Sequence, residues 1–147
     1  MSLKIPISQE DEDLPLPEYA TEGSSGVDLH ASIKGDKLIM PDETRLIDTG
    51  IRIALMEGYE GQVRSRSSIA QEGVIIPNSP GTIDSDYRGE IKVMLRNLNK
   101  SPFRIQRGDR IAQLVIQQVE HVNWYSIDSL SDTKRSDGGF GSTGRSG

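Results

Sequence analysis

Cysteine is absent from this 147-residue chain, which excludes a disulfide framework, a zinc–thiolate site and a thiol nucleophile. The absence fits a reducing compartment, and we expect a cytoplasmic protein. Long apolar runs are also missing. No segment approaches the ~20 residues of a membrane span, and the N-terminal region lacks the apolar stretch of a signal peptide. We therefore expect no membrane partner.

Excess positive charge is missing as well, because 22 acidic residues outnumber 17 basic ones and leave a net charge of −5. A surface of this sign is unsuited to long polyanions, so we expect no nucleic-acid partner. An anionic ligand would have to be met locally by clustered arginines. H-E-x-x-H, G-x-S-x-G and Walker A patterns do not occur, so zincin, serine-hydrolase and P-loop mechanisms have no support.

Alternating apolar residues predict half-buried strands at 51–55 and 91–95. Shorter extended candidates are 3–7, 38–40, 62–64, 74–76, 103–106 and 122–127. The nearly continuous apolar sequence at 111–119 predicts a strand covered on both faces, for example by another subunit. Trp124 and Tyr125 are interpreted as core or interface packing.

Turn-forming residues separate these runs at short spacing, a rhythm typical of a β-sandwich or jelly roll. One short helix is predicted at 68–72, with Ser67 as its N-cap and Gly73 as its stop. We predict one β domain over residues 1–130.

The composition changes at residue 131, since the last 17 residues contain five glycines and four serines, and Phe140 is their one large apolar side chain. Such a segment cannot build a core. It fits a disordered tail, and it equally fits an arm that folds over a ligand, with the aromatic ring stacked on a flat base. Composition alone leaves both interpretations open.

Asp84 and Asp86 lie two residues apart in a predicted hairpin turn flanked by Gly81 and Gly89. In an extended segment this spacing places both carboxylates on one side. Ordinary turn chemistry explains these residues. A carboxylate held beside a water as general base, with Tyr87 packed on the substrate, explains them too. Spacing does not decide between the two.

The segment 64–68 places two arginines and three serines at the entry to the predicted helix. Guanidinium groups, hydroxyls and free helix N–H groups suit a polyphosphate, while a capping serine beside solvent-exposed arginines explains the segment equally well. Asp28 could orient a water of a bound cation or lie exposed on a strand edge.

Five segments in order, between residues 14 and 144, resemble the five motifs of the homotrimeric dUTP pyrophosphatases. They are 26–31 (GVDLHA), 64–70 (RSRSSIA), 78–89 (NSPGTIDSDYRG), 108–114 (GDRIAQL), and Arg135 with 138–144 (GGFGSTG). Any one is weakly diagnostic, whereas five in order at family-like spacing are very specific. The resemblance implies a distorted all-β jelly-roll sandwich or barrel with one short helix and a flexible C-terminal arm. It also implies Mg²⁺-dependent hydrolysis of dUTP to dUMP and pyrophosphate, which limits uracil in DNA and supplies dUMP for thymidylate synthesis.

The resemblance assigns roles around the base, the sugar and the reacting phosphate. Asp84 would activate the water that attacks the α-phosphate, and Tyr87 would pack on deoxyribose and leave no room for a 2′-hydroxyl. Asn78 and the backbone of the following turn would read the edge of uracil and exclude thymine's methyl group. The turn residues implied in substrate binding are Gly81, Thr82 and Ile83.

The resemblance further implies a phosphate site, a metal contact and a closing arm. Phosphate-binding residues would be Arg66, Ser67, Ser68 and Gln113. Asp28 would contact Mg²⁺ through its water shell, the ion itself being chelated by the triphosphate. The arm, residues 131–147, would close a site formed by other subunits of the homotrimer, so a monomer should be inactive. Its substrate-binding residues would be Arg135, Phe140, Gly141, Ser142 and Thr143.

Three serines depart from the usual family pattern: Ser65 stands where many members have proline, and Ser68 and Ser136 where glycine is usual. The related dCTP deaminases are the first rival. They carry a catalytic glutamate on the strand after the Asp84 turn, where this chain has Met94. A catalytically silent trimer that binds nucleotides or proteins is the second rival, and the retention of Asp84 and Tyr87, with Arg66 and Phe140, speaks against it.

Overall fold

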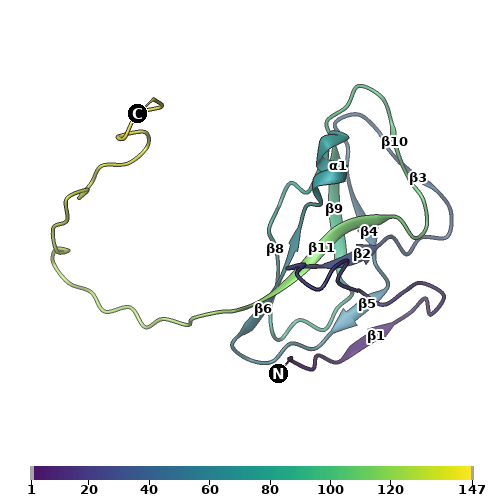
Figure 1. The fold of residues 1–147 in the computed structure, drawn as a ribbon, viewed down its shortest axis with the longest axis horizontal. Coiled ribbons are helices and arrows are strands. Elements are labelled where there is room, and N and C mark those ends of the chain that lie inside the picture. The colour runs from purple at the N-terminus through teal and green to yellow at the C-terminus, as the bar shows by residue number, and fades with distance from the viewer. Residues whose placement is uncertain (1, 147) are drawn as a thin grey trace.

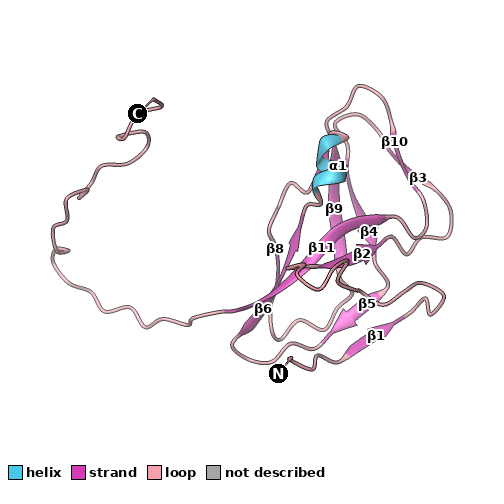
Figure 2. Cartoon of the chain, in the orientation of Figure 1, coloured by secondary structure: helices cyan, strands magenta, loops and turns pink. Residues whose placement is uncertain are grey.

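The computed structural model describes residues 2–146, in which loops connect short strands and one short helix (Figures 1 and 2). In chain order they are β1 (Ile7–Gln9), β2 (Val27–His30), β3 (Lys37–Ile39), β4 (Thr44–Asp48), β5 (Ile51–Ile53), β6 (Tyr59–Arg64), α1 (Ser67–Gln71), β7 (Val74–Ile75), β8 (Gly81–Ile83), β9 (Lys92–Asn97), β10 (Phe103–Ile105) and β11 (Arg110–Gln118). The all-β class predicted from the sequence is confirmed.

Two main sheets face the core, one with the order β2-β11-β6-β8 and one with the order β4-β9-β7. The pairs β1-β5 and β10-β3 extend the structure at its edges, and every strand pairing among the described residues is antiparallel. This jelly-roll-like arrangement brings strands that are distant in sequence side by side, as β11 does for β2 and β6.

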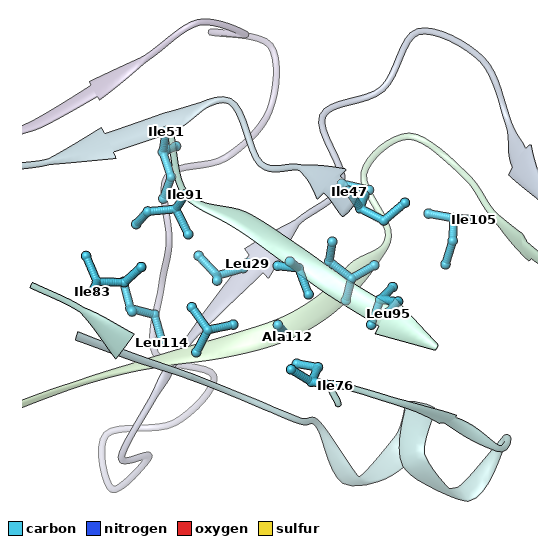
Figure 3. Close-up of a cluster of buried hydrophobic side chains, with 14 of the residues drawn as sticks. Leu29, Ile47, Ile51, Ile76, Ile83, Ile91, Leu95, Ile105, Ala112 and Leu114 are labelled. Carbon is cyan, nitrogen blue, oxygen red and sulfur yellow. The ribbon is translucent and has the colours of Figure 1, made fainter. Parts of the chain in front are cut away.

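The core between the strands is almost entirely aliphatic (Figure 3). It follows the alternation in the sequence, since Ile51 and Ile53 are buried around an exposed Arg52, and Val93 and Leu95 are fully buried. In β11, residues on both faces are buried, as predicted. A second subunit is not needed to cover Val115, because Gly26 of the same chain lies against its side chain.

Helix α1 begins one residue earlier than predicted, so the prediction of Ser67 as N-cap is wrong. Arg66 holds the N-cap position with an extended backbone (φ −92°, ψ 137°) and makes no side-chain cap hydrogen bond. Gly73 does follow the end of the helix, at φ 82°, where its missing Cβ makes the left-handed conformation accessible.

Several strand predictions need correction. The first strand is 7–9 instead of 3–7, because β1 pairs with β5 through Ile7, Ser8 and Gln9. The segment 122–127 forms no strand, because it has left the body of the protein and has no neighbouring chain to pair with (Figure 1). Strands β2, β4 and β8 were not predicted, since none of them shows clear alternation over a sufficient length.

The chain beyond β11 contains no helix or strand up to residue 146 and runs away from the body (Figure 1). Trp124 is 93% exposed and Tyr125 82% exposed, so neither belongs to the core of its own chain. The other large apolar side chains exposed there are Val122, Ile127, Leu130 and Phe140. No helix among residues 2–146 has the length and apolar character needed to cross a membrane.

Candidate active site

A pocket of about 320 Å³ opens beside β8 and the segment that follows it. Six residues implicated from the sequence line it: Asn78, Gly81, Thr82, Ile83, Asp84 and Tyr87. The remaining lining residues come from the neighbouring strands and the approach to β9: Leu46, Val63, Glu90, Lys92 and Met94. The folded chain therefore places residues of β4, β6 and β9, with Glu90 of the loop before β9, beside the segment 78–87.

The segment after β8 is a turn but does not close a hairpin, so that prediction is wrong. β8 pairs with β6, whereas β9 pairs with β4 and β7 in the other sheet. The Tyr87 N–H donates to the Asp84 carbonyl at 3.1 Å, which closes a tight turn between the two sheets. The turn and the pocket thus lie where the chain crosses from one sheet to the other.

The pocket combines an apolar floor with polar groups at its rim. Val63 and Ile83 are buried, and Leu46 and Met94 are register partners on β4 and β9. A Cβ at Gly81 would lie 3.3 Å from the Asn78 Nδ2 atom, so the glycine lets this amide approach the strand closely. A pocket that combines apolar side chains with polar groups suits a flat ring that carries hydrogen-bonding edges.

The two turn carboxylates differ in what they reach. Asp84 lines the pocket described above and also an adjacent hollow of about 640 Å³. Asp86 lines the adjacent hollow but not the pocket. Of the two aspartates, Asp84 is therefore the one within reach of a ligand in the pocket.

A second cluster forms where β2, β11 and β6 run side by side. Asp28 pairs with the Arg66 guanidinium at 3.1 Å and with that of Arg110 at 3.5 Å. Gln113 stands opposite Asp28 in the register, and its side-chain amide nitrogen, Nε2, donates to the Ser65 carbonyl at 2.9 Å. Residues from three sequence motifs are thus brought together by strand pairing.

The sequence interpretation missed Arg110 as a member of this cluster. Arg110 belongs to the recognised motif at 108–114, but the motif alone does not name its ionic partner. That partner, Asp28, lies on β2 much earlier in the chain and is brought to Arg110 by the pairing of β11 with β2. Arg66 also donates to the Ser68 hydroxyl at 3.4 Å, and both residues line a cleft of about 390 Å³ beside Arg110. Ser67 is the first residue of α1, next to Arg66.

This cluster fits an outer-shell contact to a cation better than a protein-made metal cage. Within residues 2–146 no group of three or more His, Cys, Asp or Glu side chains is placed to hold a metal ion. Asp28 offers one partly buried carboxylate between two guanidinium groups. Such a group can orient waters of an ion whose remaining ligands come from a phosphate chain.

The arm residues are not brought to either cluster in this chain. Arg135 donates from Nε to the Gly138 carbonyl at 2.8 Å, and Phe140, at φ 52°, is fully exposed. Gly141, Ser142 and Thr143 follow in local turns far along the extended segment (Figure 1). A site that used these residues would need them to move or to come from another subunit.

His30, at the end of β2, is a titratable group beside the second cluster. Its pKa is lowered, chiefly because burial penalises the charged imidazolium. Asp28 opposes this by raising the pKa, while the positive charges of Arg110 and Arg66 lower it further.

The pH dependence of stability should report this shift. Because the folded-state pKa of His30 lies below its ordinary value of 6.5, the unfolded chain takes up the proton first as the pH falls. The free energy of unfolding should therefore decrease as the pH falls through 6.5, down to the folded-state pKa. Denaturant unfolding at constant protein concentration should show a smaller loss between about pH 7.5 and about pH 5.5 for His30→Gln than for the wild type. Equal losses would contradict the prediction.

Comparison with known proteins gives consistent matches over nearly the whole chain. The family model described as dUTPase matches residues 12–144. A protein of Caldanaerobacter subterraneus subsp. tengcongensis named deoxyuridine 5'-triphosphate nucleotidohydrolase is 51% identical over 143 residues, which is 97% of this chain and 97% of the relative.

Two solved structures share the fold at low sequence identity. Staphylococcus bacteriophage 80alpha dUTPase with dUPNHPP superposes with a TM-score of 0.89 at 22% identity and covers 98% of this chain and 100% of its own. A mutant dUTPase from phage phi11 of S. aureus, described with a coordinated structural Mg(II) ion, has a TM-score of 0.78 at 20% identity. It covers 88% of this chain and 100% of its own.

Proposed function

The chain belongs to the dUTPase family, and on that premise we propose that it hydrolyses dUTP to dUMP and pyrophosphate. The observation that carries the proposal is the pocket in which Asn78, the 81–84 segment and Tyr87 meet. The full-length similarity to a nucleotidohydrolase of deoxyuridine 5'-triphosphate supports the same substrate. Such an activity would limit uracil incorporation into DNA and supply dUMP for thymidylate synthesis.

The pocket suits the nucleoside part of dUTP. The Asn78 amide and the backbone of β8 supply donors and acceptors for the edge of uracil, and the apolar floor accepts the ring. The side chain of Tyr87 stands at the pocket with its ring available to pack on deoxyribose. A 2′-hydroxyl would meet this ring, which supports selection for the deoxy sugar.

Asp84 is the proposed general base. It lies at the end of β8, where a substrate whose base occupies the pocket would extend its phosphates outward. An exposed carboxylate can accept a proton from a water that attacks the α-phosphate, and the pyrophosphate then leaves with its electron pair. Asp86 has no assigned role.

The second cluster is the proposed phosphate site. The Arg66 guanidinium, the hydroxyls of Ser67 and Ser68 and the side chain or backbone of Gln113 would bind phosphate oxygens. Mg²⁺, when bound with the triphosphate, would neutralise charge on the phosphates, and Asp28 would orient its waters. The structural Mg(II) ion described for the phi11 dUTPase supports the choice of this metal.

A homotrimer with sites at subunit interfaces is part of the proposal. Within one chain the pocket, the Arg66 cluster and the arm are separate pieces. The exposed apolar side chains at 122–130 also need burial that the chain does not supply itself. Assembly with other copies would bury them and complete the site.

The deaminase alternative is disfavoured by the carboxylates at the pocket. The family resemblance places Met94 where a dCTP deaminase has its catalytic glutamate. Besides Asp84, the pocket is lined by one carboxylate, that of Glu90, and this group accepts the Gly50 N–H at 3.0 Å. Neither carboxylate lies at the position on the strand after the turn where the family resemblance places the deaminase glutamate, since Met94 stands there.

One paired assay tests the proposal. With Mg²⁺ present, the wild-type protein should release pyrophosphate from dUTP and no ammonia from dCTP. Ammonia without pyrophosphate would favour the deaminase, and dUTP binding without either product would favour the silent trimer.

A further inference from the structure

Tyr87 is held by hydrogen bonds instead of core packing. Its side chain is 43% exposed, so burial does not fix the ring. The Tyr87 hydroxyl donates to the Glu90 carbonyl at 2.7 Å, and the Tyr87 carbonyl accepts the Arg88 guanidinium at 3.1 Å. Together with the hydrogen bond from the Tyr87 N–H to the Asp84 carbonyl, these contacts fix both the backbone of Tyr87 and the far end of its side chain.

The acceptor of the tyrosine hydroxyl is itself anchored. The Glu90 carboxylate accepts the Gly50 N–H at 3.0 Å, which ties the residue to the start of β5. The hydroxyl proton of Tyr87 is thereby committed to the protein. The ring face is the part of Tyr87 left to meet a ligand.

Gly89 lies directly against this ring. A Cβ at position 89 would stand 2.6 Å from the Tyr87 Cζ atom and 2.8 Å from Cε1, distances that real Cβ atoms essentially never show. Gly89 is not among the described glycines with positive φ, so its backbone does not require glycine. The missing side chain instead makes room for the ring in its hydrogen-bonded position.

We propose that Gly89 is a positioning residue that sets the Tyr87 ring against the sugar and thereby determines the choice between 2′-deoxyribose and ribose. The inference rests on the proposed function, in which Tyr87 contacts deoxyribose. Its physical basis is that the Tyr87 ring fits closely against Gly89 while its hydroxyl binds the Glu90 carbonyl. A side chain at position 89 forces the ring away from Glu90, and the space that excludes a 2′-hydroxyl changes shape.

Gly89→Ala tests the inference through substrate selectivity. The ratio of kcat/KM for dUTP over that for UTP should fall about tenfold or more, since apolar pockets discriminate against an added hydroxyl group by roughly a hundredfold. The fold should survive, because the atoms that must move belong to an exposed side chain. Gly35→Ala is the matched control: its Cβ meets nothing within 4 Å, and Gly35 has no positive φ. It should keep the wild-type ratio.

A double-mutant cycle separates positioning from a general structural role. If Gly89 acts through the ring, Gly89→Ala should not change selectivity further in a Tyr87→Ala protein. Two outcomes would overturn the inference and leave the proposed function standing. The first is that the two substitutions change the selectivity ratio additively. The second is that Tyr87→Ala lowers the ratio whereas Gly89→Ala leaves it unchanged. An unchanged ratio in Tyr87→Ala would overturn it by removing Tyr87 as the sugar contact. Absence of dUTP hydrolysis by the wild type would instead remove the proposed function.

Discussion

Asp84→Asn should lower kcat for dUTP hydrolysis by about 10²–10⁴-fold, the usual contribution of a positioned general base. The amide keeps the size of the carboxylate but cannot take the proton of the attacking water. Binding should persist, because the pocket that accepts the nucleoside has ten other lining residues. Pyrophosphate release under single-turnover conditions, together with a direct measurement of dUTP affinity, separates the two effects.

Asp86→Asn is the matched control, because it makes the same chemical change two residues away. Asp86 lines the adjacent hollow and not the pocket, so its replacement should leave kcat near the wild-type value. Equal losses of kcat in the two variants would show that activity depends on the total charge of the turn and not on Asp84 itself. An unchanged kcat in Asp84→Asn would remove Asp84 as the base.

Alternation of apolar and polar residues made the central strands predictable, and strands without it were not predicted. The apolar residues at 51–53 and 91–95 repeat with the period of a strand and are buried as that period requires. β8 has three residues, the first a glycine, and exists because β6 pairs with it across the sheet. The apolar residues at 122–127 resemble a strand but have no partner within the chain, so pattern alone predicted too much there.

The candidate site was predictable as a set of residues but not as a geometry. The motif around Asp84 named six residues that line one pocket in the structure, yet its hairpin interpretation was wrong because the flanking strands join different sheets. Arg110 and Glu90 were missed for a shared reason. Their partners, Asp28 and Gly50, lie far away along the chain, and strand pairing or a single backbone N–H brings them into contact.

Removing the chain after Leu130 should leave trimers whose turnover of dUTP is reduced at least about a hundredfold. The arm would supply a charge-assisted contact from Arg135, worth about 1.5–3 kcal/mol, and stacking of Phe140 on the base, worth about 1–3 kcal/mol. Neither side chain packs against the body in the isolated chain, so folding should not depend on them. Sedimentation checks the trimer and pyrophosphate release checks activity. Retained activity would mean that the segment is only a tail.

Mixed trimers then decide whose arm closes which site. The truncated subunit keeps Asp84 but has no arm, and the Asp84→Asn subunit keeps its arm but has no base, so each protein alone should be nearly inactive. If the arm closes a site whose Asp84 belongs to another subunit, co-expression should give activity well above that of either parent, because some sites combine the intact aspartate with an intact arm. If each arm folds back on its own pocket, no site in a mixed trimer has both parts and no activity returns. The extended course of the chain beyond β11, away from the body of its own subunit (Figure 1), favours the first outcome.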